Sequence, residues 1–365
     1  MIKICHVTSV HRAFDGRIFK KECKSLTSQY DVYLIASNVP DQIVDGVKLV
    51  GVPLPKSRMK RQFQLSKVYK TAVRIDAEVY HFHDPELIPI ASKLKKKGKK
   101  VIFDSHEDIP SDILEKKYIP KPFRKIISTI YSSYEKSKFK EFDALISVTP
   151  SIVDRLKTYN PMTFQVTNYP IYKDVAISEK KENYVCFTGA ISSTWRIDTL
   201  IKSIDEIDTK IVLAGPLSEV YKKELSSLKS WSKVDYRGFV DSSDVDEIQK
   251  NAIAGIAILK KGNLYGGQQG TVGNTKLFEY MMNGTPVIAT DVTLWKEIVE
   301  KNQCGICVDP YDESSISKAI LYLQNNPDKV KEMGENGKKA IKEKYNWKEQ
   351  ETILLDLYDK ILKNK

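Results

Sequence analysis

The residues Gly273-Asn-Thr-Lys-Leu-Phe-Glu-Tyr-Met-Met-Asn-Gly-Thr-Pro-Val-Ile-Ala-Thr290 form the most informative segment of this chain. A glycine-rich loop, Tyr265-Gly-Gly-Gln-Gln-Gly270, precedes a helical pattern in which Lys276 and Glu279 lie one turn apart, near one face. Asn283-Gly284 is a helix stop signal, and the apolar residues after it predict a buried strand. A loop that enters a helix N-terminus offers free backbone N–H groups to a phosphate. A carboxylate one turn further on can accept two hydroxyl groups, as a ribose presents.

This order of loop, helix and strand resembles the donor-binding motif of retaining glycosyltransferases with the GT-B fold. More narrowly, it is similar to glycosyltransferase family 4 (group 1), whose members often carry N-K-x-x-E-Y-M-x-x-G-x-P here. The resemblance implies a nucleotide-sugar donor bound by Gly273, Asn274, Thr275, Lys276 and Glu279. It also implies an α/β fold in which two Rossmann-like parallel-sheet domains face each other across a cleft. For such a loop taken alone, an ordinary amphipathic helix is the alternative.

Length and composition favour two globular domains. The chain has 365 residues, of which 41% are hydrophobic and 29% charged. Strand and helix patterns alternate through both halves, which predicts parallel sheets covered on both faces. The extended link Asn168-Tyr-Pro-Ile-Tyr172 separates an acceptor-side domain, residues 1–170, from a donor-binding domain, residues 171–345. The resemblance implies that the C-terminal helix, residues 346–365, crosses back to the first domain.

The apolar patterns predict strands in both domains. In the first domain, a helix over Arg17–Gln29 follows the first strand, and the strands are Ile2–Val10, Val32–Ala36, Val79–Phe82, Val101–Phe103 and Ala144–Val148. In the second domain the strands are Tyr184–Phe187, Lys210–Ala214, Val234–Tyr236, Ala254–Leu259, Val287–Ala289 and Gly305–Val308.

Several patterns exclude other classes of site or location. No apolar run approaches the ~18 residues of a membrane span, and residues 2–8 predict a strand rather than a signal peptide. We therefore expect a cytoplasmic protein.

Cys304-Gly-Ile-Cys307 runs into a strand end rather than a helix N-terminus, which predicts structural cysteines. Asp244-Val-Asp246 lies in the first turn of a predicted helix, where acidic side chains favour the dipole, and predicts a helix start rather than a metal site.

The positive charge is concentrated in the first half. Residues 1–170 hold 30 Lys and Arg against 18 Asp and Glu, and the remainder holds 28 against 29. The basic tracts are Lys56–Arg61, Lys93–Lys100 and Lys116–Lys140. In the last tract lysines alternate with aromatic and aliphatic residues, so an anionic membrane surface at the inner face of a membrane is one partner. The alternative is a solvated helix whose stripe Phe123, Ile127, Ile130 and Tyr134 faces the core. We expect no nucleic acid partner.

The turn after the first strand is the first candidate for the active site. His11 opens the segment, Asp15 is a suitable N-cap, and Gly16 lets backbone approach a ligand. The turn Asp15-Gly-Arg-Ile-Phe19 resembles one in many family 4 relatives, where this loop faces the diphosphate and the acceptor. The resemblance implies a catalytic role for Asp15 and a donor contact for Gly16, with His11 on the acceptor side. Pure helix capping is the alternative role of Asp15.

Two further strand ends carry histidines. His81-Phe-His83-Asp84-Pro85 combines a His-x-His pair with an N-cap and a proline at the first helical position. A metal site of His81, His83 and His106 is conceivable, but we expect no metal or other cofactor, because GT-B enzymes as a class need no catalytic metal. We place His83 and Asp84 on the acceptor side, in the exposed part of the cleft.

Phe103-Asp-Ser-His-Glu-Asp108 follows the next strand and resembles the D-S-H-E motif of the same relatives. There a histidine hydrogen-bonds the donor sugar near its reacting carbon. The resemblance implies this catalytic role for His106 and an acceptor-side position for Glu107. A histidine that caps the next helix is the alternative.

The second domain begins with Thr188-Gly-Ala-Ile-Ser-Ser-Thr-Trp-Arg196, which the resemblance places at the donor diphosphate. It implies donor contacts for Gly189 and Arg196, and for Phe239 and Val240 at the nucleobase. Relatives usually carry one cation just after the glycine, where this chain has Ala190. Lys276 is the candidate for the missing charge, with Lys260 and Lys261 in reserve. A surface arginine is the alternative for Arg196.

One further position departs from the family pattern. The donor motif often contains a glutamate that contacts the sugar, eight residues before Glu279, and this chain has Thr271 there. The groups that can contact the sugar in place of this glutamate are Gln268, Gln269 and the backbone of residues 270–271. The identity of the sugar is therefore open.

The sequence thus predicts a retaining hexosyltransferase. It would move a hexose from a nucleotide-diphosphate sugar to a hydroxyl of a lipid-linked or growing glycan, as in polysaccharide biosynthesis. The alternatives are another GT-B enzyme, such as a sugar-nucleotide epimerase or a phosphorylase, and a non-catalytic scaffold, which Thr271 and Ala190 would favour.

Overall fold

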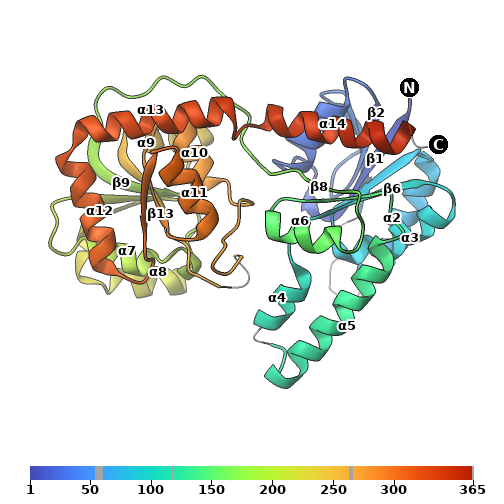
Figure 1. The fold of residues 1–365 in the computed structure, drawn as a ribbon, viewed down its shortest axis with the longest axis horizontal. Helices are drawn as coiled ribbons and strands as arrows, with labels where there is room; N and C mark the ends of the chain where they lie inside the picture. Colours follow the sequence, from blue (N-terminus) through green and yellow to red (C-terminus); the bar gives the residue numbers. More distant parts are fainter. Residues whose placement is uncertain (54–60, 117, 263–265, 364–365) are drawn as a thin grey trace. The chain divides into compact units, whose positions relative to one another are not determined.

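The computed structural model describes residues 1–53, 61–116, 118–262 and 266–363. It divides into two compact units, Met1–Asn168 with Trp347–Lys365 and Tyr169–Asn346. Each unit is built on its own sheet (Figure 1). The basic tract that begins at Lys56 lies, except for Arg61, outside the described residues, as does Tyr265 of the glycine-rich loop.

The described residues of the first unit form an eight-stranded sheet in the order β3-β4-β2-β1-β5-β6-β7-β8. Its strands are β1 (Lys3–Arg12), β2 (Asp31–Ser37), β3 (Gln42–Val44), β4 (Val47–Val52), β5 (Val79–Phe82), β6 (Lys100–Ser105), β7 (Ala144–Ser147) and β8 (Thr163–Gln165). Its helical segments are η1 (Ile18–Cys23), α1 (Lys24–Leu26), α2 (Arg61–Ile75), η2 (Pro85–Leu87), α3 (Ile88–Lys96), α4 (Ile109–Glu115), α5 (Lys121–Phe139), α6 (Pro150–Lys157) and α14 (Trp347–Lys363).

The second unit contains a six-stranded sheet in the order β11-β10-β9-β12-β13-β14 among its described residues. Its strands are β9 (Glu182–Thr188), β10 (Lys210–Ala214), β11 (Val234–Gly238), β12 (Ala252–Ala257), β13 (Val287–Thr290) and β14 (Gly305–Val308). Its helical segments are η3 (Ser193–Trp195), α7 (Ile197–Ser203), α8 (Glu219–Ser226), η4 (Lys229–Lys233), α9 (Ser242–Asn251), α10 (Lys276–Met282), α11 (Thr293–Lys301), α12 (Glu313–Asn325) and α13 (Pro327–Glu343).

Pairing is parallel throughout the second sheet and in all of the first except its β3 edge. There β3 runs antiparallel to β4, and this hairpin is missing from the sequence prediction. Asp45 and Gly46 join the two strands with φ angles of 50° and 80°. Both residues are left-handed, as a two-residue hairpin turn requires, so the Asp-Gly pair was the available signal.

The predicted helix over Arg17–Gln29 is only partly correct. Residues Ile18–Cys23 form a π-helical segment, and a single α-helical turn, Lys24–Leu26, follows it. The amide of Glu22 donates to the carbonyl of Arg17 at 3.0 Å, five residues back. Such a bulge is frequent at functional sites, and here both side chains of this pair are buried.

Each sheet has one point where the chain reverses its direction of winding. In the first sheet β1 lies between β2 and β5, and in the second β9 lies between β10 and β12. The loops that leave the two middle strands therefore diverge from the loops of their neighbours at the carboxyl end of each sheet. Open parallel sheets bind their ligands at this point.

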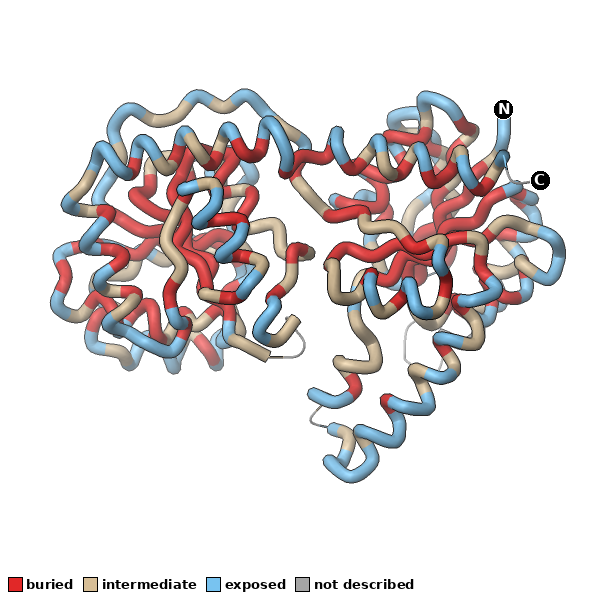
Figure 2. The backbone as a smooth tube through the Cα atoms, in the orientation of Figure 1, coloured by how far each residue is buried: buried red, intermediate tan, exposed pale blue. Residues whose placement is uncertain are grey.

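Both sheets are buried between helices (Figure 2). The C-terminal helix α14 packs on the first sheet through Leu354, Leu357 and Ile361, which are at most 3% exposed. Full burial of one such side chain contributes about 1.5–3 kcal/mol. Gln350 of the same helix accepts a hydrogen bond of 2.7 Å from the amide of Thr167. Helix α14 is thereby part of the first unit.

Helices α4 and α5 form a hairpin that projects from the first unit (Figure 1). Ser128 of α5 donates a hydrogen bond of 2.7 Å to the carbonyl of Pro110. Six apolar side chains of the hairpin are 39–68% exposed: Leu114, Tyr118, Phe123, Ile126, Ile127 and Ile130. The predicted core-facing stripe is therefore wrong for Phe123, Ile127 and Ile130, whereas its fourth member, Tyr134, is half-buried and packs against the core of the first unit.

None of the described helices has the length and hydropathy that crossing a membrane requires.

Candidate functional site

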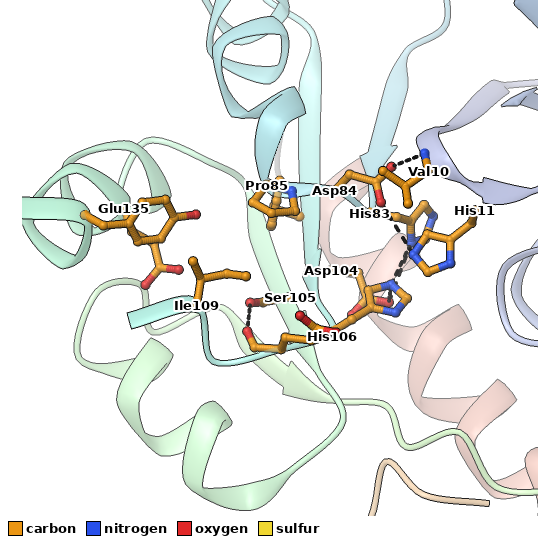
Figure 3. Close-up of a pocket in the computed structure, with 13 residues that line it drawn as sticks. Val10, His11, His83, Asp84, Pro85, Asp104, Ser105, His106, Ile109 and Glu135 are labelled. Atoms are coloured by element: carbon orange, nitrogen blue, oxygen red, sulfur yellow. Dashed lines mark hydrogen bonds and ion pairs between the residues drawn. The ribbon is translucent and has the colours of Figure 1, made fainter. Parts of the chain in front are cut away.

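The carboxyl ends of β1, β5 and β6 surround a cavity of about 210 Å³ in the first unit (Figure 3). The polar side chains that line it include His11, His83, Asp84, His106 and Glu107. All five were predicted from three separate strand ends, and the parallel order β1-β5-β6 places those ends side by side.

Asp84 occupies the N-cap position before Pro85, but its side chain does not cap that turn. Its carboxylate instead accepts hydrogen bonds from the hydroxyl of Thr8 at 2.8 Å and from the amide of Ser9 at 2.6 Å. These bonds tie the end of β5 to the end of β1. The other carboxylate oxygen lies 3.4 Å from Nε2 of His11 and so fixes this histidine at the cavity.

Three histidines form a hydrogen-bonded row from the core to the cavity. Nε2 of His6 lies 3.2 Å from the hydroxyl of Tyr358, and Nδ1 of His6 lies 3.0 Å from Nε2 of His83. Nδ1 of His83 then lies 3.2 Å from Nε2 of His106. Burial lowers the pKa of His83 and of His106, so both imidazoles are neutral near pH 7. The side chain of His83 is fully buried, which corrects its predicted exposed position.

A buried ion cluster supports this row. The guanidinium of Arg17 lies 2.7 Å from Asp104 and 2.9 Å from Glu22, and none of the three side chains is more than 4% exposed. Burial alone would raise the pKa of Asp104, but Arg17 and the neighbouring histidines hold it below its usual range. Burial raises the pKa of Glu22. Arg17 also donates to the carbonyl of Val166 at 2.8 Å and so joins η1 to the end of β8.

Asp15 caps the π-helical segment. Its carboxylate accepts hydrogen bonds from the amides of Arg17 at 2.7 Å and Ile18 at 2.9 Å, and lies 3.7 Å from Nδ1 of His11. Burial opposes ionisation, but the nearby His11 and the two amide hydrogen bonds lower the pKa of Asp15 below its usual range. The neighbouring carboxylate of Asp15 raises the pKa of His11. No atom lies within 4 Å of a side chain built at Gly16, so a ligand has room there.

In the second unit, Lys276 is the centre of the candidate donor site. Its ammonium donates a hydrogen bond to the carbonyl of Thr188 at the end of β9, and lies 4.7 Å from the ring of Phe187 and 5.3 Å from that of Trp195. A Cβ atom at Gly189, where φ is +118°, would lie 2.0 Å from this ammonium. Burial lowers the pKa of Lys276.

Two backbone amides of the loop before α10 are hydrogen-bonded to side chains of the same loop. The hydroxyl of Thr271 accepts from the amide of Gly273 at 3.1 Å, and the side chain of Asn274 accepts from the amide of Lys276 at 3.2 Å. In the described part of the chain, the amides of Asn274 and Thr275 have no acceptor, and the carboxylate of Glu279 has no hydrogen bond. Two of the four amides predicted to hold phosphate are therefore already occupied.

Arg196 adopts a left-handed conformation with φ of 47° and starts α7. Its guanidinium lies 3.1 Å from Asp198, donates to Thr199 at 2.6 Å and stacks 5.3 Å from the ring centre of Tyr311. The arginine is thus held by its own helix. Lys261 pairs with Asp291 at 2.8 Å, whereas Lys260 is exposed.

Glycines with positive φ end three neighbouring strands of the second unit, at positions 189, 215 and 238. The amide of Gly215 donates to the carbonyl of Gly238 at 2.6 Å, which aligns the loops after β10 and β11. Phe239 follows directly and is 84% exposed, while Val240 is half-buried. A highly exposed aromatic ring at a strand end is suited to stack on a planar ligand.

Two family models match the chain, one in each unit. The model for Glycosyltransferase Family 4 matches residues 16–166, and the model for Glycosyl transferases group 1 matches residues 170–340. The chain belongs to the group 1 glycosyltransferases.

Relatives and solved structures agree with this assignment. An uncharacterized glycosyltransferase of Methanocaldococcus jannaschii is 22% identical over 369 residues, which cover 91% of each chain. The structure of sucrose-phosphate synthase from Thermosynechococcus elongatus has a TM-score of 0.80 at 15% identity, with 100% of both chains covered. HepE from Anabaena, solved with UDP and glucose, has a TM-score of 0.72 at 11% identity, covering 99% of this chain and 100% of its own. These likenesses confirm the predicted GT-B fold of two Rossmann-like domains.

Other predicted features of this glycosyltransferase are structural. Cys304 is buried and Cys307 half-buried, and burial raises the pKa of each thiol to about 12, so neither is a reactive thiolate. Asp244 lies in the first turn of α9, and Asp246 accepts a hydrogen bond from Asn283 at 3.2 Å. Among the described residues, the groups with metal-ligand spacing are instead His6, Glu22, His81 and His83, and His83, Asp104 and His106.

Sequence reasoning missed the ion cluster of Arg17, Glu22 and Asp104. Arg17 and Asp104 lay inside the motifs that identified the site, next to Asp15 and His106. A charged residue inside a buried strand, such as Asp104 in β6, was the signal, because a buried carboxylate needs a partner.

Proposed function

We propose that this glycosyltransferase transfers a hexose, with retention of configuration, from a nucleotide-diphosphate sugar to a hydroxyl of a lipid-linked or growing glycan. The observation that carries the proposal is the position of Lys276. Its ammonium lies at the end of β9 and against Gly189, where it would be 2.0 Å from an added Cβ atom. This is where an open parallel sheet binds a nucleotide.

The second unit would bind the donor through three kinds of contact. Lys276 and the free amides of Asn274 and Thr275 would face the diphosphate, and charge-assisted bonds of this kind are the strong ones. Glu279, one turn along α10, would accept two hydroxyl hydrogens from the ribose. Phe239 and Val240 would contact the nucleobase. UDP is the first nucleotide to test, since the HepE structures contain UDP or UDP-glucose.

To bind the diphosphate, Arg196 would have to break its ion pair with Asp198. Its ion pair with Asp198 is about a quarter exposed on both sides, so the pair contributes little stability and its loss costs little. The diphosphate carries about two negative charges against one on Asp198 and would compete for the guanidinium. Lys276 needs no such exchange, because its only described acceptor is one carbonyl.

The chemical step would depend on stabilising the leaving diphosphate. The bond between the sugar C1 and the phosphate oxygen breaks, a bond from C1 to the acceptor oxygen forms on the same face, and the acceptor proton goes to the leaving phosphate. Lys276, Arg196 and the loop amides would stabilise the developing negative charge. No protein nucleophile and no metal ion takes part in this scheme.

The first unit would supply the groups around the reacting sugar and the acceptor. His106 is the only histidine of the buried row that reaches partial exposure, with a side chain 19% exposed. Its hydrogen bond to His83 fixes the ring, and a neutral imidazole can donate to or accept from a sugar hydroxyl. Asp15 and His11 would orient the acceptor hydroxyl beside it, with Asp84 and Glu107 along the cavity wall.

The α4–α5 hairpin supports a lipid-linked acceptor. It presents six exposed apolar side chains together with exposed Lys121 and Lys125. Aliphatic side chains between lysines suit the headgroup region of an anionic bilayer. We propose that the hairpin rests on the cytoplasmic surface of a membrane and brings lipid-linked acceptors to the cavity of the first unit.

A transfer assay tests the activity. The enzyme is incubated with UDP-glucose carrying radiolabelled glucose and with a bacterial lipid extract, and lipid-soluble label is counted with and without EDTA. We expect incorporation in both cases and an α-linked product by NMR. Release of free nucleotide without incorporation would indicate another GT-B reaction, and an inverted linkage would contradict retention. Donor binding without any turnover across nucleotide sugars and acceptors would favour the scaffold.

A further inference from the structure

Three potential ligand atoms converge at the inner wall of the first unit's cavity. They are Nδ1 of His83, Nε2 of His106 and a carboxylate oxygen of Asp104, and Figure 3 shows the three side chains directed toward one another. Two of the side chains come from β6 and its end, and one from the end of β5. The proposed transfer reaction requires no such convergence.

The separations between these atoms match those around a tetrahedral metal ion. Nδ1 of His83 and Nε2 of His106 are 3.2 Å apart, and they lie 3.8 Å and 3.4 Å from Oδ2 of Asp104. Zinc binds nitrogen and carboxylate oxygen at about 2.0–2.2 Å, so the ligands of one tetrahedral ion lie about 3.3–3.6 Å apart. The three separations thus differ from the tetrahedral values by only a few tenths of an ångström.

The hydrogen bonds on the core side of His83 can orient this histidine as a metal ligand. Ligating histidines usually donate their other ring N–H to a neighbouring acceptor. Nε2 of His83 lies 3.0 Å from Nδ1 of His6, and Nε2 of His6 lies 3.2 Å from the hydroxyl of Tyr358. That hydroxyl lies 2.9 Å from Nδ1 of His81. In one arrangement of protons, Nε2 of His83 donates to His6, Nε2 of His6 donates to Tyr358, and Tyr358 donates to His81. Nδ1 of His83 then carries no proton, and its lone pair faces His106.

Asp104 is likewise held, and its ligating oxygen, Oδ2, is shared with Arg17. Arg17 donates to Oδ2 of Asp104 from Nε at 3.1 Å and from its terminal nitrogen at 2.7 Å. The second oxygen, Oδ1, is buried and has no hydrogen-bond partner among the described residues. Ligating carboxylates are commonly hydrogen-bonded in this way. The guanidinium charge weakens cation binding, and the carboxylates of Asp84 and Glu107 in the cavity wall oppose that effect.

We propose that His83, Asp104 and His106 form a three-ligand site for a divalent transition metal ion such as Zn²⁺, with a fourth position open to the cavity. Two histidines and one carboxylate with an open position are the ligand set of many catalytic zinc sites. Mixed nitrogen and oxygen ligands favour Zn²⁺, Co²⁺ or Ni²⁺ over Mg²⁺, which prefers oxygen alone. If the proposed function holds, the ion would occupy Nε2 of His106 and inhibit transfer.

Cobalt and zinc titrations of the intact chain test the site without any activity assay. Protein stripped with EDTA is titrated with Co²⁺, whose visible absorption reports tetrahedral coordination, and then with Zn²⁺ by calorimetry. We expect one ion per chain, a tetrahedral cobalt spectrum that Zn²⁺ abolishes, and no heat with Mg²⁺. His106→Gln should weaken Zn²⁺ binding by at least about 100-fold, since even changes outside the direct ligands cost about 10–100-fold.

Two further variants locate the ion. His83→Gln should also abolish the cobalt spectrum, and circular dichroism without metal shows whether that buried variant remains folded. His11→Gln, a histidine of the same cavity outside the ligand set, should retain binding within a few-fold. Zinc binding that survives His106→Gln, or that is lost equally in His11→Gln, would overturn the assignment. These measurements of metal binding need no turnover. They therefore test the metal site even if the protein is inactive in every transfer assay.

Discussion

The ammonium of Lys276 in α10 donates a hydrogen bond to the carbonyl of Thr188 at the end of β9. These residues are 88 positions apart in the sequence, and the contact brings the helix of the donor motif to the first loop of the second unit. It places a buried cation beside Gly189, at the reversal point of the sheet. The predictions below depend on this contact and on the cavity of the first unit.

Replacing Lys276 with Met should weaken nucleoside diphosphate binding by about 10- to 100-fold, because a hydrogen bond to a charged group contributes about 1.5–3 kcal/mol. Lys223→Met, which removes an exposed lysine of α8, should bind normally. Calorimetric titration measures both. Equal affinities in the two variants would remove Lys276 from the donor site.

The same lysine predicts a pH dependence. Burial lowers the pKa of Lys276, and only the charged form attracts phosphate. Donor affinity should therefore fall as the pH rises from neutral toward the alkaline range, at a lower pH than for an ordinary lysine. The nucleobase can also titrate in this range, so the decisive quantity is the difference between wild type and Lys276→Met. Parallel pH profiles of the two proteins would contradict the prediction.

Gly189→Ala and Gly16→Ala should behave differently. At Gly189, with φ of +118°, an added Cβ would lie 2.0 Å from the ammonium of Lys276, whereas nothing lies within 4 Å at Gly16. We expect Gly189→Ala to lower the melting temperature and nucleotide affinity together. Gly16→Ala should melt like the wild type, and any loss of kcat/KM in it would report a ligand close to the backbone. A wild-type melting temperature and affinity in Gly189→Ala would show that the loop can rearrange.

Phe239→Ala should weaken nucleotide binding by roughly 10-fold, since stacking of a base on an aromatic side chain contributes about 1–3 kcal/mol. The ring is 84% exposed, so the melting temperature without ligand should not change. Ribose 5-phosphate, which has no base, should lose no affinity in the variant. A similar loss for both ligands would indicate a general disturbance of the loop instead of stacking.

The double variant Phe123→Ser/Ile130→Ser should reduce sedimentation with phosphatidylglycerol vesicles without lowering the melting temperature. Both side chains are more than half exposed. Val220→Ser, which removes an apolar side chain that is 83% exposed in the second unit, is the control. Wild type should bind anionic vesicles better than phosphatidylcholine vesicles. Undiminished binding by the double variant would show that the hairpin is not the contact.

Arg17→Met should be strongly destabilising. It leaves Glu22 and Asp104 buried without a cation, and the loss of one partner from a buried pair costs about 3–5 kcal/mol. Lys24→Met breaks an ion pair with Asp45 whose side chains are about half exposed, and should cost little. Urea unfolding compares the two variants, and equal midpoints would show that the buried cluster does not stabilise the first unit.

The sequence predicted the strands of both sheets well where apolar runs were flanked by turns. Val79–Phe82, Lys210–Ala214 and Gly305–Val308 have the expected bounds. It missed β3, β4 and β8, since two of these have three residues and β4 alternates buried with half-buried positions. Periodicity alone could not find the π-helical turn, because that turn accommodates the buried charges of Arg17 and Glu22, whose partner Asp104 lies in β6.

The site was predictable as a set of residues but not as a set of contacts. Strand ends identified His11, His83, Asp84 and His106, and the sheet order brought them together. The burial of His83 beneath His106, and the capture of Arg196 by Asp198, depend on side-chain packing across elements. A pattern in a single sequence does not record contacts between elements. Asp84 is the clearest example, since it occupies an N-cap position but makes no capping hydrogen bond.

A thermal-shift panel of UDP, GDP, ADP, dTDP and CMP on wild type and Glu279→Ala tests the donor site most directly. The carboxylate of Glu279 has no described hydrogen bond and lies one turn beyond Lys276, so its removal should leave the unliganded protein intact. We predict that one nucleotide raises the melting temperature of the wild type and that Glu279→Ala loses most of this increase. A panel in which no nucleotide stabilises the wild type, or in which both proteins are stabilised equally, would contradict the assignment of the second unit as a nucleotide-sugar site.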